Sequence, residues 1–403
     1  MILSMCTAEA YTYDFSSADE FLNYLRPSGD HWETHDGKLR WIFRGQRDAS
    51  WSLVPTAWRT DPKTVKEINH LGTLTDSLLG EGFWLNRRSF NVPEAIACAL
   101  KQSEMELRML QEFIAHANIA GTLFPNSSVN INAPDFGFIA SASDMVEIFH
   151  EGFKHTKSAF FDAVLRSQRV DLRGQIPSPT EYDLAEIHRL LKCWPFAFNF
   201  TMRNSITALA QHHGIPTRLL DWSHDSRKAA FFSCQDFGEA VDLKSRIAVY
   251  GLNPFMLQHR FVSERDLADH TDNPEALALI LSSHSTFIEK TQTTSYLAAQ
   301  EGLFTYPKFA DLYKIFVGDY PTIDRCLELM AGWRDKNSEP SPPIGDYIRK
   351  VTLPYLEVDN LLDMLDDERI ILSTMMPNLD KFKECMISRS KRKNRISQKK
   401  ITP

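Results

Sequence analysis

Residues 206–232 read ITALAQHHGIPTRLLDWSHDSRKAAFF, and this stretch indicates how helix and strand alternate along the chain. The segment 206–213 is helix-like and stops at Gly214 and Pro216, two residue types that end regular structure. Residues 218–222 then predict a buried strand or a tight connection, and Asp225 provides an N-cap for a second helix. This short stretch therefore places a strand, or a connection of the same length, between two helices.

Sequence patterns on either side of this stretch predict further strands and helices. Residues 39–43 (LRWIF), 245–252 (SRIAVYGL) and 347–353 (YIRKVTL) are rich in β-branched and aromatic residues and predict strands. Residues 16–25 predict a short capped helix, and residues 104–117 predict a helix that faces the core. Regular strand-helix-strand spacing is absent, so we expect an α+β fold with a mixed or antiparallel central sheet and flanking helices, not a doubly wound α/β fold.

A chain of this length could form two domains of about 200 residues or one large domain with insertions. Residues 119–180 are expected to be an insertion, and residues 384–403 a basic tail. Glycine, asparagine, proline and serine punctuate the predicted insertion. The tail contains the run ISRSKRKNRISQKK at residues 387–400, with seven lysines or arginines and no acid. Such a run predicts disorder, and it is either a solvated terminus or an arm that binds RNA, DNA or a surface.

Composition narrows the class of protein. The chain has 403 residues, of which 43% are hydrophobic and 24% charged, and this excludes disorder, collagen and coiled coil as descriptions of the whole. Its net charge of −7 gives no global basic field for nucleic acid or anionic membrane. The six cysteines are scattered singly, so we expect reduced thiols and no metal site. No signal peptide or long apolar run is evident, which predicts a cytoplasmic protein without membrane contact.

Three polar clusters lie in otherwise apolar surroundings. They are Arg44-Gly45-Gln46, residues 211–223 and Gln300-Glu301. Placing charged side chains among aromatic residues costs free energy unless each charge is paired. The clusters are therefore either internal salt-bridge networks or parts of a functional site.

The motifs in these clusters resemble the FRG-domain family. They are Phe43-Arg44-Gly45-Gln46 followed by Trp51-x-Leu53-x-Pro55, the run QHHGIPTRLLDW at 211–222, Ala229-x-Phe231-Phe232, and QEGLFT at 300–305. The resemblance spans about residues 14–383 and leaves the basic tail outside. One departure is Met375-Met376 before Pro377, where the family more usually has an aromatic residue.

A second similarity, to NAD-dependent ADP-ribosyltransferases, is the one that implies an activity. It rests on the order of an early aromatic-Arg-Gly motif, a polar strand followed by a helix, and a late carboxylate. It implies an ADP-ribosyltransferase-like fold that uses NAD as a substrate and modifies a macromolecular acceptor, either a protein or a nucleic acid. The same resemblance implies a toxin or phage-defence effector, with an antitoxin or regulatory protein as a partner.

This similarity also assigns roles to residues. Glu301 would be catalytic by hydrogen-bonding the ribose 2′-hydroxyl and balancing positive charge, and Gln300 would position the acceptor. Arg44 would bind pyrophosphate or ribose oxygens through its forked donors, with Gly45 allowing close approach of the backbone. The other residues expected to bind NAD are Gln46, His212, Thr217, Arg218, Asp221, Trp222 and Ser223.

Other interpretations remain open at this stage. Arg44, Arg218 and Asp221 would equally form a buried ion-pair network that fixes the core. His212 and His213, at a predicted helix end, suit a cap or a core pair better than a metal site. The alternative function is a non-catalytic module that binds a nucleotide or a peptide. A hydrolase that uses Asp221 with a histidine has less support, because no nucleophile motif accompanies them.

Overall fold

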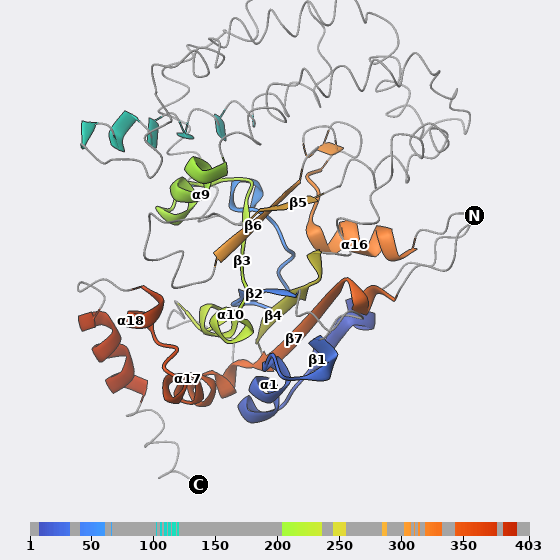
Figure 1. Cartoon of the computed structure of the whole chain (residues 1–403), viewed down its shortest axis with the longest axis vertical. Coiled ribbons are helices and arrows are strands. Elements are labelled where there is room, and N and C mark those ends of the chain that lie inside the picture. The colour runs from blue at the N-terminus through green and yellow to red at the C-terminus, as the bar shows by residue number, and fades with distance from the viewer. Residues whose placement is uncertain are drawn as a thin grey trace, which may run out of the picture.

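The structure is a computed structural model of the chain (Figure 1). It describes residues 8–32, 41–60, 66, 204–235, 245–254, 284–287, 302–307, 310, 313–314, 319–332, 343–376 and 382–392, together with parts of 102–120.

A mixed seven-stranded sheet forms the centre of the described fold, with strand order β1-β7-β4-β2-β3-β6-β5. The strands are β1 (Thr12–Asp14), β2 (Ile42–Gln46), β3 (Leu220–Ser223), β4 (Arg246–Leu252), β5 (His284–Phe287), β6 (Gly302–Pro307) and β7 (Ile348–Pro354). Every neighbouring pair is antiparallel except β1 and β7, which run parallel. The predicted α+β class with a mixed sheet and flanking helices is confirmed.

Helices flank this sheet in the described parts of the chain. They are α1 (Ala18–Leu25), α9 (Asn204–His212), α10 (Ser226–Ser233), α16 (Ile323–Gly332), α17 (Val358–Asp367) and α18 (Leu372–Met375). The predicted caps are confirmed, because the Ser17 side chain accepts a hydrogen bond from the Glu20 N–H and the Asp225 side chain accepts one from the Arg227 N–H. The positions of these helix starts are therefore set locally by the sequence.

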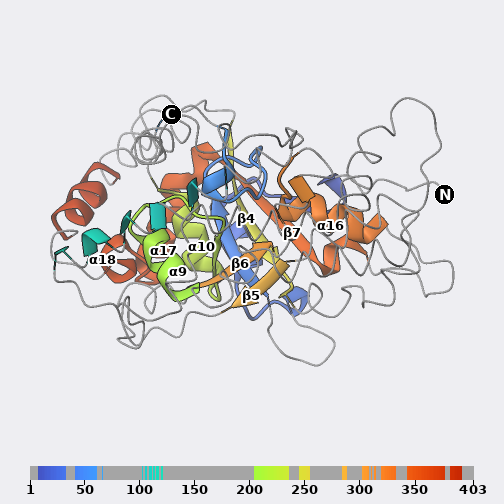
Figure 2. The same ribbon diagram turned by 90° about the horizontal axis from the view of Figure 1, so that it is seen from above.

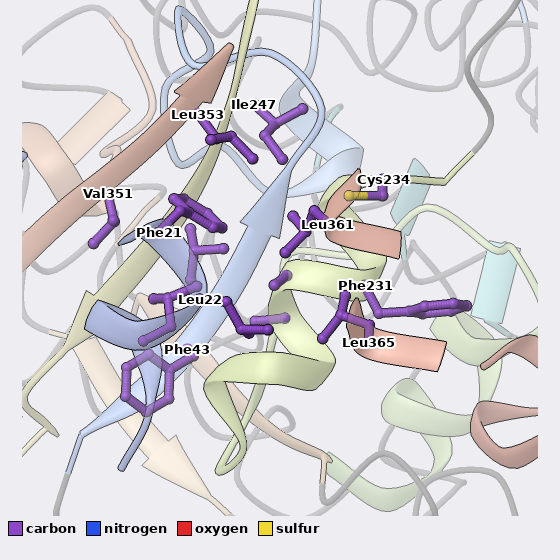
Figure 3. Packing of buried hydrophobic residues seen from close by; sticks show 14 of the residues in the cluster. Phe21, Leu22, Phe43, Phe231, Cys234, Ile247, Val351, Leu353, Leu361 and Leu365 are labelled. Carbon is purple, nitrogen blue, oxygen red and sulfur yellow. The ribbon is translucent and has the colours of Figure 1, made fainter. Parts of the chain in front are cut away.

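The two faces of the sheet carry separate apolar clusters. One face packs against α1, α10 and α17, and Figure 2 shows α10 and α17 on the opposite side of β4 from α16. Figure 3 labels buried side chains of this cluster from α1, α10, α17 and the sheet, among them Phe21, Leu22, Phe231, Leu361, Leu365, Phe43, Ile247, Val351 and Leu353. On the other face, Ile323 and Leu327 of α16 pack with strand residues that include Trp222. The central strands β2 and β4 are thus covered on both sides.

A third, smaller cluster places α9 against the β3 and β6 side of the sheet. Ala208 of α9 is buried with Leu219, Phe304 and Tyr306. Phe304 pairs with Asp221 across the β3–β6 ladder. This packing brings the C-terminal end of α9 close to the polar side chain of β3.

The basic tail differs from its prediction over part of its length. Residues 382–392 are helical, whereas the sequence predicted disorder from residue 384. The reason is charge compensation: Arg389 and Arg392 both form ion pairs with Asp366 of α17, and Arg392 also pairs with Asp363. Arg392 and Cys385 of this helix are buried. The predicted insertion at 119–180 lies almost entirely outside the described residues, and the limits of 14–383 stay a prediction.

No described helix combines the length and apolar character needed to cross a membrane. Within the same residues, no group of three or more histidine, cysteine or acidic side chains is arranged to hold a metal ion. The cysteines that the structure describes, Cys234, Cys326 and Cys385, are buried.

Candidate functional site

Arg44 is the charged residue of the central strand β2. Its neighbour Phe43 pairs with Ser223 of β3, so the two polar clusters at residues 44–46 and 211–223 meet on adjacent strands (Figure 1). The Arg44 side chain is only 10% exposed. Its Nη1 donates to the backbone oxygen of Asp221 at 2.8 Å and to Asp221 Oδ1 at 2.6 Å. The ion pair between Arg44 and Asp221, which the sequence offered as the alternative to a ligand-binding role, therefore forms in the structure.

The guanidinium of Arg44 is not fully satisfied by these contacts. Its Nε is buried and has no hydrogen-bond partner among the residues that the structure describes. A buried donor without an acceptor is unfavourable by about 1–3 kcal/mol, and more when the group is charged. Such an atom marks a position where a ligand oxygen or a water would be stabilised.

Asp221 differs from its partner in exposure. Its side chain is 63% exposed, so solvent screens the ion pair and limits its contribution to about 1 kcal/mol or less. Desolvation by the surrounding protein acts to raise the pKa of Asp221 despite this exposure. The charge and hydrogen bond of Arg44 outweigh that effect, with a smaller contribution from Arg59, and the pKa is lowered. Asp221 is therefore an ionised carboxylate at neutral pH.

Gln211, in the last turn of α9, connects Asp221 to the loop that leads into β3. Gln211 Nε2 donates to Asp221 Oδ1 at 3.1 Å, and the Thr217 hydroxyl donates to Gln211 Oε1 at 2.6 Å. The Leu219 N–H in turn donates to Thr217 Oγ1 at 3.2 Å. Gly214 makes this return of the chain possible, because its φ of +87° is one that other residues rarely adopt. Thr217 is thus engaged inside the protein, at 5% exposure.

Gly45 is required by packing. A Cβ at this position would lie 2.0 Å from Ala229 O and 2.6 Å from Ser233 N, both in the backbone of α10. The space left by the missing side chain is therefore filled by α10. Gln46 is also engaged internally, since its Nε2 donates to Trp51 O at 3.0 Å. These contacts give both residues a structural role, and their predicted contact with NAD stays a prediction.

Trp222 and Ser223 continue β3 but face the protein interior. Trp222 is 3% exposed, and its indole N–H donates to Thr305 Oγ1 at 2.8 Å. The Ser223 hydroxyl, also buried, accepts a hydrogen bond from the Asp225 N–H at 3.1 Å. Both contacts join neighbouring elements of the fold, so a ligand would reach these two side chains only after a rearrangement.

Arg218 belongs to a different ion pair. Its Nε donates to Glu106 Oε2 at 2.6 Å, with the two side chains 5% and 8% exposed. Glu106 Oε1 also accepts a hydrogen bond from the Trp58 indole at 3.0 Å, and the Arg218 guanidinium lies 5.6 Å from the Trp58 ring centroid. The structure therefore separates Arg218 from the Arg44–Asp221 pair, although the sequence grouped all three. For Arg218 the structural interpretation has direct support.

His212 ends α9 beside Gln211. Its ring lies 5.4 Å from that of His213 in an edge-on arrangement, and the His213 ring stacks on Phe113 at 6.0 Å. Burial lowers the pKa of His212, and the adjacent His213 lowers it further. The imidazole is therefore neutral at pH 7. His212 is half-buried and His213 is exposed, so the two rings form a pair at the protein surface at the end of α9.

The predicted catalytic residues Gln300 and Glu301 lie outside the described residues. The described strand β6 begins at the next residue, Gly302, which pairs with Ser223. The polar cluster Gln300-Glu301 therefore directly precedes β6, the strand that pairs with β3. The roles of Gln300 and Glu301 stay predictions.

Two residues near this site were not selected from the sequence. Gln211 belongs to the quoted motif, but a glutamine in a helix gives no signal of the direction in which its amide points. Arg59 acts on Asp221 through its charge, and its own Nε donates to Val54 O at 3.3 Å. Arg59 directly follows the 3-10 helix Thr56–Trp58, which is too short for sequence periodicity to predict.

Comparisons with known proteins support only part of the sequence interpretation. No curated protein matches the chain. No solved structure matches it either, so the ADP-ribosyltransferase-like fold stays a prediction. The family match covers residues 169–240, which include the described segment from α9 through β3 to α10 and leave Arg44 outside. The chain thus carries an FRG domain match, at residues 169–240, over the segment that supplies Asp221 and Gln211.

Proposed function

We propose that this protein is an NAD-consuming enzyme of the ADP-ribosyltransferase type that modifies a macromolecule. Arg44 would bind the pyrophosphate of NAD, and the Asp221 side of the site would contact a ribose. Glu301 would stabilise the positive charge that develops on the reacting ribose. The acceptor would be a protein or a nucleic acid.

The observation that carries this proposal is the state of Arg44. Its side chain is nine-tenths buried, its Nε lacks a partner among the described residues, and its neighbour Asp221 is open to solvent. Arginine binds phosphate oxygens through parallel N–H donors, and a low-exposure site strengthens such bonds. A buried guanidinium with an unused donor therefore suits an anionic ligand better than a purely structural ion pair does.

The proposed reaction exchanges one bond for another at the ribose. The bond between nicotinamide and C1′ breaks, nicotinamide leaves with the bonding electrons, and a nucleophilic atom of the acceptor bonds to C1′ and loses its proton. The transition state resembles that of glycoside hydrolysis, in which a nearby carboxylate offsets developing positive charge. Loss of a positioned charge of this kind typically lowers turnover by about 100-fold or more.

The first experiment is an assay of nicotinamide release from NAD by the purified protein, with cell lysate protein and total RNA supplied as acceptors. Wild type should release nicotinamide, and Glu301→Gln should bind NAD with similar affinity but release at least about 100-fold less. Arg44→Lys keeps the positive charge but removes the paired N–H donors of the guanidinium, and it should weaken NAD binding by about 10-fold or more. Arg325→Lys, an exposed arginine of α16, is the matched control and should behave like wild type.

A second candidate function, a non-catalytic binding module, is favoured by a specific observation. Thr217, Trp222, Ser223 and Gln46 all make internal hydrogen bonds, so few of the predicted ligand residues are available to a substrate. NAD binding without nicotinamide release, in wild type and variants alike, would favour this module. Absence of NAD binding would overturn the proposed enzyme and the assignment of NAD as the ligand. The proposed toxin or phage-defence role predicts growth arrest on expression that Glu301→Gln relieves.

A further inference from the structure

Among the described residues, the side chains that donate hydrogen bonds to the Asp221 carboxylate do so at one of its two oxygens. Oδ1 accepts from Arg44 Nη1 at 2.6 Å and from Gln211 Nε2 at 3.1 Å. The two side-chain hydrogen bonds that other described residues donate to this carboxylate both reach Oδ1, and the Asp221 side chain is 63% exposed. The carboxylate is thus held at one oxygen and open at the other.

The chain of hydrogen bonds behind Gln211 determines which end of its amide faces Asp221. The Thr217 hydroxyl accepts from the Leu219 N–H and directs its single proton to Gln211 Oε1 at 2.6 Å. The amide NH₂ must then point to the carboxylate, because the reverse orientation would bring two acceptors together. A buried threonine therefore fixes, through Gln211, the direction in which the carboxylate is held.

We propose that Asp221 is a hydroxyl-recognition residue, in which Oδ2 accepts the O–H of a sugar in the ligand, while Gln211 and Thr217 are positioning residues. This inference rests on the proposed function, since it takes the ligand to be NAD. It deepens that function, because it names Oδ2 of Asp221 as the atom that accepts the sugar hydroxyl and gives Gln211 and Thr217 a positioning role.

The charges around Asp221 favour a hydroxyl over other groups. A phosphate at Oδ2 would meet a carboxylate of like charge, whereas an O–H donor meets an ionised acceptor and forms a strong hydrogen bond. An ammonium group would be attracted to Asp221 but repelled by Arg44, which bonds to the same carboxylate, and by Arg59, whose charge also acts there. A sugar phosphate therefore suits this pair of side chains, because Arg44 can bind its phosphate while Asp221 accepts a hydrogen bond from one of its hydroxyls.

The test is a binding cycle that combines a protein change with a ligand change. Calorimetry measures the affinity of wild type and Asp221→Asn for NAD and for NAD analogues that lack a single ribose hydroxyl. If Oδ2 accepts that hydroxyl, wild type should bind one analogue about 10- to 100-fold more weakly than NAD, as expected for a hydrogen bond to a charged group. Asp221→Asn should bind NAD and the same analogue with nearly equal affinity.

The positioning role is tested with a matched pair at Thr217. Thr217→Ser keeps the hydroxyl and should discriminate against the same analogue as wild type does. Thr217→Val removes the proton donor to Gln211 and should reduce that discrimination at least about fivefold at an unchanged fold, checked by circular dichroism. Asp367→Asn, an exposed carboxylate of α17, controls for the loss of one negative charge.

The outcomes separate the two proposals. If NAD binds but every deoxy analogue loses as much affinity with Asp221→Asn as with wild type, the hydroxyl role is overturned while the proposed function stands. If Thr217→Val discriminates as wild type does, the positioning role is overturned. If wild type does not bind NAD, both the proposed function and this inference are overturned.

Discussion

Replacing Gly45 by alanine should destabilise the protein strongly, because α10 occupies the space of a side chain at this position. The new Cβ would lie 2.0 Å from Ala229 O and 2.6 Å from Ser233 N. Ordinary contacts begin near 3.4 Å, so α10 would have to move by about 1.4 Å. Both atoms belong to one turn of helix backbone, which cannot yield as the end of a flexible side chain would.

The expected magnitude follows from what that movement disturbs. α10 is held between β2 and α17 in the apolar cluster around Phe43, and displacing it opens gaps on its other side. Overpacking a core by one methyl group typically destabilises by about 1–3 kcal/mol, and a clash with backbone belongs at the upper end. We therefore expect Gly45→Ala to lower the unfolding free energy by about 3 kcal/mol and the melting temperature by about 5 °C or more.

The assay is chemical denaturation followed by tryptophan fluorescence, since Trp222 and Trp32 are buried in the native state. The matched control is Gly345→Ala, where the nearest atom to the new Cβ is Tyr13 Oη at 3.9 Å. The control should stay within about 0.5 kcal/mol of wild type. An equal effect at the two glycines would refute the packing argument.

The remaining predictions concern the ion pair, a histidine and a helix end. Glu106→Gln should lower the unfolding free energy by about 3–5 kcal/mol in urea denaturation, because it removes the negative charge that lies 2.6 Å from the buried Arg218 guanidinium; a loss below 1 kcal/mol would contradict this. The folded-state pKa of His212 lies below its ordinary 6.5, so the unfolded state binds a proton more readily. The unfolding free energy should therefore fall as the pH drops below about 6.5 and level off beneath the folded-state pKa. This dependence of the unfolding free energy on pH should vanish in His212→Gln. Arg369→Gly should raise the melting temperature, with a gain of about 1 kcal/mol, because Arg369 adopts a φ of 63° at the end of α17; an unchanged or lower value would contradict this.

Local elements were predictable because their determinants are local. The cap at Asp225, the stop at Gly214 and the strand residues 245–252 each depend on a few neighbouring side chains, and the structure has them within two residues of the prediction. The parallel pairing of β1 with β7 was not predictable, since these strands lie more than three hundred residues apart and their register depends on the whole sheet. The helix at 382–392 was missed because its charges are compensated by α17, which composition alone does not reveal.

The candidate site was predictable in its residue types but not in its pairings. The sequence grouped Arg44, Arg218 and Asp221, and only the structure shows that Glu106 takes Arg218 out of the group. Tertiary packing decides which residue pairs with a buried charge, and Glu106 lies 112 positions before Arg218 in the sequence. The orientation of Gln211 is likewise set by Thr217, through a hydrogen bond that no sequence pattern encodes.

The pairing of β1 with β7 has a consequence for synthesis of the protein. β7 lies between β1 and β4, so the strand that joins the earliest segment to the centre of the sheet is the last to leave the ribosome. Until residues 348–354 emerge, β4 lacks one neighbour and exposes the hydrogen-bonding edge that β7 later covers. The nascent chain therefore has an open β4 edge while residues 253–354 are being synthesised, which is the period when a chaperone would be needed most.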